Sequence, residues 1–151
     1  MSDTVSPLAP ESFPQLPPLA GVALGTLAAG LRYQGRNDLF VAELAEGTSV
    51  AGVFTRSLCP SAPVDWCKQL LDSGSRTARA VVCNAGNANA FTGSAGEASV
   101  QVTVETLADQ LGMLPEEIFV ASTGVIGEPM PDDLLRSSLP VLAGAIGAAS
   151  P

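Results

Sequence analysis

Histidine is absent from this 151-residue chain, and its absence excludes two common forms of nucleophilic catalysis. Ser-His-Asp and Cys-His sites both use an imidazole to take the proton from the nucleophile. Acyl transfer would therefore need another base, or a base from another chain. The three cysteines, Cys59, Cys67 and Cys83, form no C-x-x-C pair, which argues against a zinc site or a disulfide framework. We expect buried structural thiols in a reducing cytoplasm.

Basic residues and long apolar runs are also scarce. Seven Lys and Arg residues against 15 Asp and Glu residues give a net charge of −8, so nucleic acid is not an expected partner. No window approaches the roughly 18 uncharged apolar residues of a membrane span, and the N-terminus lacks the basic start of a signal peptide. Neither a P-loop nor a dinucleotide-binding glycine motif occurs, so no nucleotide cofactor is expected.

Aromatic residues make up 5% of the chain and charged residues 15%, whereas 46% of the residues are apolar. This composition is typical of one α/β domain, or part of one, with a core filled mainly by small aliphatic residues. Five prolines crowd the N-terminal segment, which predicts an extended, disordered tail over residues 1–18. The remaining residues, 19–151, are predicted to form the domain.

Short β-like runs, separated by turns that contain glycine, begin at Gly21. Residues 35–38 and 46–47 are suitable hairpin connectors, because Gly and Asn tolerate positive φ and Asp can bond its own backbone. The pattern predicts an antiparallel meander. Its strands are residues 21–26, 28–33, 39–44 and 49–55.

Charged side chains on the meander allow a structural and a functional interpretation. Asp38 is predicted to be an exposed turn carboxylate, with binding of a substrate amine as the alternative. Three arginines can bind carboxylates in a bidentate manner, although arginine on a strand edge is usually solvated or paired. These are Arg32, Arg36 and Arg56. None of the four residues identifies a function by itself.

Apolar residues recur at helical spacing in three later segments. Pro63 at the start and Gly74 just past the end delimit the first segment, and Gly112 ends the second. Asp132 and Asp133 begin the third, where carboxylates complement the positive end of a helix. The predicted helices cover residues 63–73, 96–111 and about 132–139, and the predicted strands between them cover residues 78–83 and 118–120.

Two loops after these strands carry the candidate site residues. Residues 121–127 read Ala-Ser-Thr-Gly-Val-Ile-Gly, in which the Thr123 hydroxyl and the Gly124 backbone N–H give two donors with little side-chain bulk. Such a pair suits stabilisation of an oxyanion, although an ordinary turn has a similar composition. Residues 84–93 include three amides that either satisfy backbone groups in a tight turn or line a polar substrate site. These are Asn84, Asn87 and Asn89.

The order of several short motifs resembles one known family. The motifs are Gly-Val-Ala-Leu-Gly (21–25), Gly-Leu-Arg-Tyr (30–33), Arg-Asn-Asp-Leu (36–39), Ala-Gly-Val-Phe-Thr-Arg (51–56), Asn-Ala-Gly-Asn-Ala-Asn-Ala (84–90) and Ser-Thr-Gly-Val-Ile-Gly (122–127). The chain resembles the N-terminal, or α, segment of the glutamate N-acetyltransferases of arginine biosynthesis, also called ornithine acetyltransferases. The resemblance implies an α/β fold with layers of helices and sheets, similar to N-terminal-nucleophile hydrolases, of which this chain is the α portion.

The resemblance also implies a mechanism. Members of the family are made as a precursor that cleaves itself and frees an N-terminal threonine on the β segment, which acts as nucleophile with its own α-amine as base. This threonine takes the acetyl group from N-acetylornithine and passes it to glutamate in a ping-pong reaction. By the same resemblance, Thr123 and Gly124 form the oxyanion hole, and the α and β segments assemble as α₂β₂. From the cysteine pattern and the missing nucleotide motifs, no metal or bound cofactor is expected.

The chain departs from the family pattern in one respect that matters for activity. The Ala-Thr-Met-Leu-like segment with the nucleophile, and the Thr-Thr-Asp and Lys-Gly stretches before it, do not occur here, and no threonine follows Thr123. We therefore expect a truncated α segment that is inactive alone. Use of acetyl-CoA stays open, as do two other functions: a related self-cleaving aminopeptidase or amide hydrolase, and a non-catalytic fragment that binds amino acids.

Overall fold

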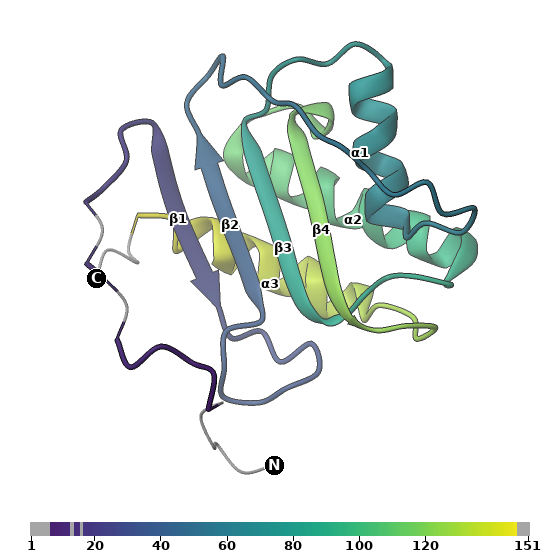
Figure 1. Cartoon of the computed structure of the whole chain (residues 1–151), viewed down its shortest axis with the longest axis horizontal. Helices are drawn as coiled ribbons and strands as arrows, with labels where there is room; N and C mark the ends of the chain where they lie inside the picture. The colour runs from purple at the N-terminus through teal and green to yellow at the C-terminus, as the bar shows by residue number, and fades with distance from the viewer. Residues whose placement is uncertain (1–6, 13, 16, 148–151) are drawn as a thin grey trace.

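The computed structural model describes residues 7–12, 14–15 and 17–147 (Figure 1). Strands and helices alternate after an N-terminal pair of strands, which confirms the predicted α/β class. The strands are β1 (Val22–Leu27), β2 (Leu39–Leu44), β3 (Ala80–Asn87) and β4 (Ile118–Val125); the helices are α1 (Ala62–Asp72), α2 (Gly93–Leu111), the 3₁₀ turn η1 (Pro115–Glu117) and α3 (Asp132–Gly144).

The four strands form one sheet in the order β1-β2-β3-β4 (Figure 1). Strands β1 and β2 are antiparallel, as are β2 and β3, whereas β3 and β4 are parallel and are connected through α2. A parallel pair needs such a crossover, because the chain must return to the end at which it started. The carboxyl ends of β3 and β4 therefore lie at the same edge of the sheet.

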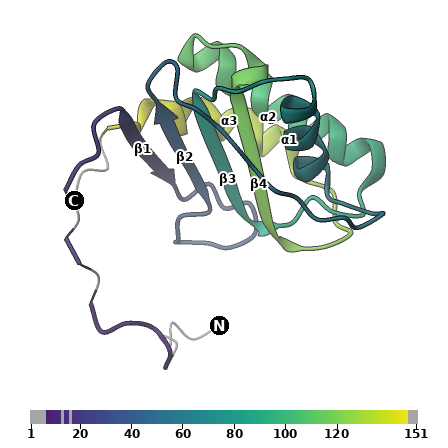
Figure 2. The same cartoon turned by 45° about the horizontal axis from the view of Figure 1, so that its top comes forward.

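Helices α2 and α3 cover one face of the sheet, as both views show (Figures 1 and 2). Alternate residues of the central strands point to this face, since side chains of a strand alternate between its two sides. Leu107 of α2 and Leu139 of α3 are completely buried in the resulting core. The strand residues of this core are Leu39, Val41, Ala80, Val82, Ile118 and Val120.

Helix α1 packs against β4 and contributes to a smaller cluster with Phe119. The Trp66 indole donates a hydrogen bond to the Ile118 carbonyl at 2.9 Å, and the Cys67 thiol donates to the Val120 carbonyl at 3.3 Å. Pro63 lies at the helix start and Gly74 follows the end with φ +95°, as predicted. The segment before α1 crosses in front of β3 and β4 in Figure 1.

Two predicted strands are wrong. Residues 28–33 form a loop, because the Asp38 carboxylate accepts hydrogen bonds from the backbone N–H groups of Ala29 and Leu31 at 2.7 and 2.6 Å. In residues 49–55, a single bridge from Ser49 to Thr77 replaces the predicted strand. At the end of this segment, the Thr55 hydroxyl accepts a hydrogen bond from the Ser57 N–H. Such a local bond competes with the backbone pairing of strands.

Four elements are longer than predicted, whereas β1, β2 and α1 have the predicted length. Strand β3 continues to Asn87 and β4 to Val125, because each supplies backbone partners to the other beyond the apolar runs. Helix α2 begins at Gly93 and ends at the predicted Gly112 cap. Helix α3 passes Leu139 and includes Pro140, because burial of Leu142 holds the last turn in the core.

The predicted domain division stays a prediction. The described residues among 7–18 are exposed and belong to no helix or strand, and residues 1–6, 13, 16 and 148–151 lie outside the described residues. Within the described part of the chain, no helix has the length and apolar character that a membrane span requires.

Candidate functional site

The parallel pairing of β3 and β4 brings the two predicted site motifs together. Ala85 is paired with Thr123, and Gly86 with Gly124, so the amide-rich motif lies beside the Ser-Thr-Gly motif along the same edge of the sheet. Residues 84–87 and 122–125 belong to the strands and not to the loops that we predicted, whereas residues 88–92 and 126–127 lie outside the strands. Their proximity follows from the β3-α2-β4 connection, since two parallel neighbours end at the same edge.

Gly124 occupies a position that no other residue could fill without a backbone shift. Its φ is +140°, and an added Cβ would overlap the Gly86–Asn87 peptide of the neighbouring strand. Gly86 is similarly constrained, since its φ is +109° and an added Cβ would lie 2.8 Å from the Cβ of Arg32. The two glycines thus allow three backbone segments to lie in close contact, which a side chain would prevent.

Thr123 and Gly124 are both exposed. Ile118 and Val120 point into the core beneath α2 and α3, so the alternation of a strand directs Thr123 to the opposite face. An exposed hydroxyl next to an exposed glycine peptide is accessible to a carbonyl group that approaches this face. The geometry is therefore compatible with the predicted pair of oxyanion donors.

The three asparagines of the amide motif bond to the backbone, which favours the structural interpretation over a substrate-binding wall. The Asn84 amide donates to the Asn87 carbonyl at 2.8 Å, and the Asn87 amide donates to the Glu128 and Pro129 carbonyls at 3.0 and 3.2 Å. The exposed fractions of Asn84, Asn87 and Asn89 are 9%, 6% and 1%. Buried amides need such partners, because an unpaired polar group in the interior is destabilising.

Asn89 holds the start of α2. Its amide donates to the Gly96 carbonyl at 2.9 Å, and its side-chain oxygen accepts a hydrogen bond from the Thr92 hydroxyl at the same distance. The residue has φ +46°, a conformation that asparagine tolerates better than most residues. Its backbone carbonyl also accepts from the Ala62 N–H, which links this loop to the start of α1.

Three of the four charged candidate residues have structural partners among the described residues. Asp38 is 3% exposed and organises the loop before it, so the prediction of an exposed carboxylate is wrong. Arg32 forms an ion pair with Glu128 at 2.6 Å, and the Arg36 guanidinium lies 4.1 Å from the centre of the Tyr33 ring. Arg56 is exposed, and no ion pair is found for it within the described residues.

The cysteines differ in exposure, which corrects the prediction of three buried thiols. Cys59 is exposed in the segment before α1, Cys67 is buried and Cys83 is half-buried. Burial raises the pKa of Cys67 and, separately, that of Cys83, so both remain protonated at neutral pH. Among the described residues, no group of three or more metal-ligating side chains is found.

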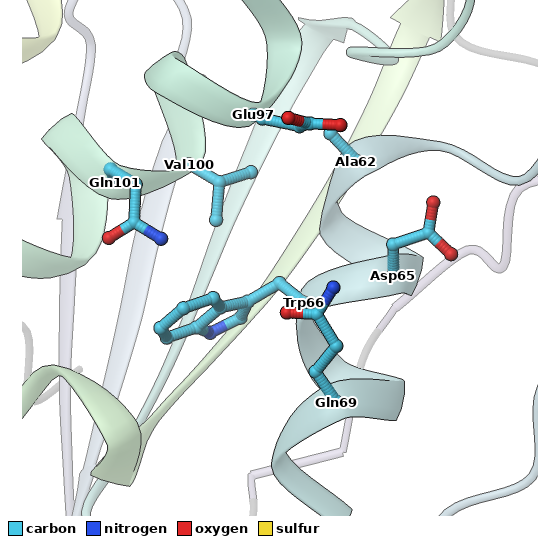
Figure 3. Close-up of a pocket in the computed structure, with 7 residues that line it drawn as sticks. All are labelled: Ala62, Asp65, Trp66, Gln69, Glu97, Val100 and Gln101. Atoms are coloured by element: carbon cyan, nitrogen blue, oxygen red, sulfur yellow. The ribbon is translucent and has the colours of Figure 1, made fainter. Parts of the chain in front are cut away.

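A hollow between α1 and α2, of about 180 Å³, was not anticipated from the sequence (Figure 3). Its walls combine two carboxylates and two amides with an indole and two aliphatic side chains. None of the predicted site residues lines it. The lining residues are Ala62, Asp65, Trp66, Gln69, Glu97, Val100 and Gln101.

The fold is that of the ornithine acetyltransferases. It is similar to the crystal structure of ornithine acetyltransferase complexed with ornithine from Mycobacterium tuberculosis, with 37% identity and a TM-score of 0.78 over 84% of this chain and 68% of the crystal chain. The arginine biosynthesis bifunctional protein ArgJ of Bacillus halodurans is also similar, with 26% identity and a TM-score of 0.74 over 80% of this chain and 62% of that one.

The chain belongs to the ArgJ family, whose family model matches residues 23–150. It is 55% identical over 130 residues to the arginine biosynthesis bifunctional protein ArgJ of Bradyrhizobium diazoefficiens, which covers 86% of this chain and 31% of that protein. The ArgJ of Mesorhizobium japonicum is 50% identical over 151 residues, which is the whole of this chain and 35% of the relative. The chain thus spans about a third of the length of these curated relatives.

Proposed function

We propose that this chain is the α segment of a self-cleaving acetyltransferase that moves an acetyl group from N-acetylornithine to glutamate in arginine biosynthesis. The main support is the exposed Thr123–Gly124 pair, which lies where β3 and β4 end together in a chain of the ArgJ family. The names of the relatives connect the family to arginine biosynthesis and to ornithine acetyl transfer.

In the proposed reaction, Thr123 and Gly124 stabilise charge and do not attack. A nucleophilic threonine on the β segment adds to the acetyl carbonyl, and the oxygen of the resulting tetrahedral intermediate becomes negative. The Thr123 hydroxyl and the Gly124 N–H donate hydrogen bonds to that oxygen. Ornithine then leaves, and glutamate takes the acetyl group from the acetyl-enzyme. Without the β segment, the chain has no nucleophile and is inactive.

The proposed β segment has support from the coverage of the relatives and from exposed apolar side chains. The chain covers 68% of the Mycobacterium crystal chain but 31–35% of the curated relatives, so that crystal chain is much shorter than a whole ArgJ protein. Phe91 and Ile126 are 73% and 63% exposed, and the Gly127 N–H bonds to the Ala90 carbonyl between their two loops. An apolar surface of this kind is suited to contact with another segment, which we place in an α₂β₂ assembly.

We further propose a cytoplasmic location and no bound cofactor. The half-buried Cys83 and exposed Cys59 are free thiols, as is usual in a reducing compartment. Acetyl-CoA is proposed as a second acetyl donor, since the relatives are named bifunctional. Neither the amide motif nor the Ser-Thr-Gly motif distinguishes the two donors.

The experiment that tests this function uses the full-length protein that contains this chain. We expect it to form N-acetylglutamate from N-acetylornithine and glutamate, with initial rates that give the parallel double-reciprocal lines of a ping-pong reaction. Release of acetate without transfer to glutamate would contradict the proposal and favour the amide hydrolase. Binding of ornithine by calorimetry, with neither transfer nor hydrolysis, would instead favour the non-catalytic binding protein.

A further inference from the structure

We propose that Asn87 is a positioning residue that fixes the Thr123–Gly124 pair in the orientation that oxyanion stabilisation needs. The proposal rests on the proposed function, because it gives Asn87 a part in the same reaction. Asn87 is the last residue of β3 and is 6% exposed. It does not have to touch the substrate; it acts through the backbone of the neighbouring strand and loop.

The Asn87 side chain holds two segments with its two polar atoms. Its amide nitrogen donates to the carbonyls of Glu128 and Pro129 at 3.0 and 3.2 Å, and these residues lie four and five positions after Gly124. Its side-chain oxygen accepts from the Asn89 N–H at 2.7 Å. The side chain therefore ties the loop after β4 to the loop after β3.

The Asn87 backbone holds the strand on the other side of Gly124. A bulge at Gly86 and Asn87 pairs Asn87 with both Thr123 and Val125, and the Ala88 N–H donates to the Val125 carbonyl at 2.9 Å. Gly124 lies between these pairing partners and against the Gly86–Asn87 peptide. Asn87 thus restrains the chain before Gly124 through the bulge and after it through the side-chain amide.

This double restraint determines where the two donors point. Gly124 has φ +140°, a conformation that glycine adopts readily and other residues rarely do, so its surroundings must select it among the many that are open to glycine. If the loop at Glu128 and Pro129 were released, the peptide planes around Gly124 could rotate, and the N–H would lose its alignment. Oxyanion stabilisation depends on donors fixed before the reaction, so that a small misplacement lowers turnover and leaves ground-state binding nearly unchanged.

The test replaces one buried amide by a carboxylate of the same shape. Asn87→Asp keeps the oxygen that accepts from Asn89 and removes both donated bonds to the loop after β4. The matched control is Asn89→Asp, which makes the same chemical change in the same motif but removes the bond to Gly96 at the start of α2. Asn87→Ser serves as a second variant if Asn87→Asp does not fold, because a hydroxyl can bond to the Asn89 N–H but is too short to reach Pro129.

Amide hydrogen exchange of the full-length protein gives a readout that does not depend on activity. In Asn87→Asp we expect the amides of residues 122–128 to exchange at least about 10-fold faster, whereas Asn89→Asp speeds exchange at the start of α2. Unchanged exchange over residues 122–128 in folded Asn87→Asp or Asn87→Ser protein would overturn the proposal, whatever the activity of the enzyme.

Kinetics then separate positioning from general loss of structure. We expect Asn87→Asp to lower kcat for acetyl transfer by about 10- to 100-fold with KM within about threefold of the unaltered enzyme. In a Thr123→Ala background the same change should still lower kcat, because the Gly124 N–H that it misplaces is still present. An equal fall of kcat in the Asn89→Asp control, or a KM that changes as much as kcat in Asn87→Asp, would overturn the proposal. If the unaltered protein transfers no acetyl group, the proposed function fails, and the exchange measurement still decides whether Asn87 positions the pair.

Discussion

The first and second halves of β3 and β4 are both paired in parallel, but they serve different purposes. In the first halves, Ala80 and Val82 on β3 and Ile118 and Val120 on β4 are buried beneath α2 and α3. In the second halves, residues 84–87 of β3 lie beside residues 122–125 of β4, and each of these segments includes a glycine with positive φ. One half is held by apolar packing, and the other by directed hydrogen bonds.

The difference shows why stability and site geometry can be assigned to separate parts of one sheet. Apolar burial is proportional to area and has no preferred direction, so it fixes the sheet without fixing any one peptide plane. Hydrogen bonds to a buried amide depend on distance and angle. The core half therefore provides the free energy of folding, and the polar half sets the direction of the groups that we assign to the reaction.

The largest effect on stability is expected from a cavity in the core half. Leu107 of α2 is completely buried in the cluster against the sheet. Leu107→Ala in the full-length protein should lower the free energy of unfolding by about 2–5 kcal/mol, because it removes buried methyl groups and leaves a void. Denaturant unfolding measures the change. Turnover per folded molecule should stay within about twofold, since the polar half keeps its hydrogen bonds.

Leu114 offers a matched control for this change, because it is a leucine that is 63% exposed. Leu114→Ala should alter the free energy of unfolding by no more than about 0.5 kcal/mol. A tenfold loss of turnover in folded Leu107→Ala protein would contradict this division between the two halves, because it would show that the core also sets the geometry of the site.

The converse effect is expected from Thr123. Thr123→Ala removes one proposed donor from an exposed position, so kcat should fall by about 10² to 10³, with little change in the thermal midpoint. Thr123→Ser should restore most of the activity, because it restores the hydroxyl. Ser122→Ala is the neighbouring control and should leave kcat within about threefold. Equal losses for Thr123→Ala and Ser122→Ala would show that the strand, not one hydroxyl, matters.

Much of the fold could be predicted from the sequence, because its periodicity reports burial. The runs at β1 and β2 and the apolar spacing of α2, with its Gly112 cap, match the structure closely. The predicted strand over residues 28–33 was wrong because a side chain outside the segment fixes its backbone conformation. The Asp38 carboxylate accepts hydrogen bonds from the Ala29 and Leu31 N–H groups, and no local sequence pattern reveals these bonds.

The site was predicted in its residues but not in its arrangement. Polar residues and glycines after an apolar run are typical of a loop, so residues 84–87 and 121–125 were placed outside the strands. The structure extends both strands because each motif pairs with the other across the crossover through α2. A strand, a helix and a strand in succession predict parallel pairing, and that signal would have placed the motifs side by side.

In the proposed reaction, this chain stabilises the oxyanion and another segment supplies the nucleophile. This division of roles is tested by incubating the full-length protein with N-acetylornithine in the absence of glutamate and locating the trapped acetyl group by peptide mass spectrometry. We predict one acetyl group on an N-terminal threonine of a segment that follows this chain in the precursor, and none on Thr123. An acetyl group on Thr123, or on any other residue of this chain, would contradict the account, because the chain would then carry its own nucleophile.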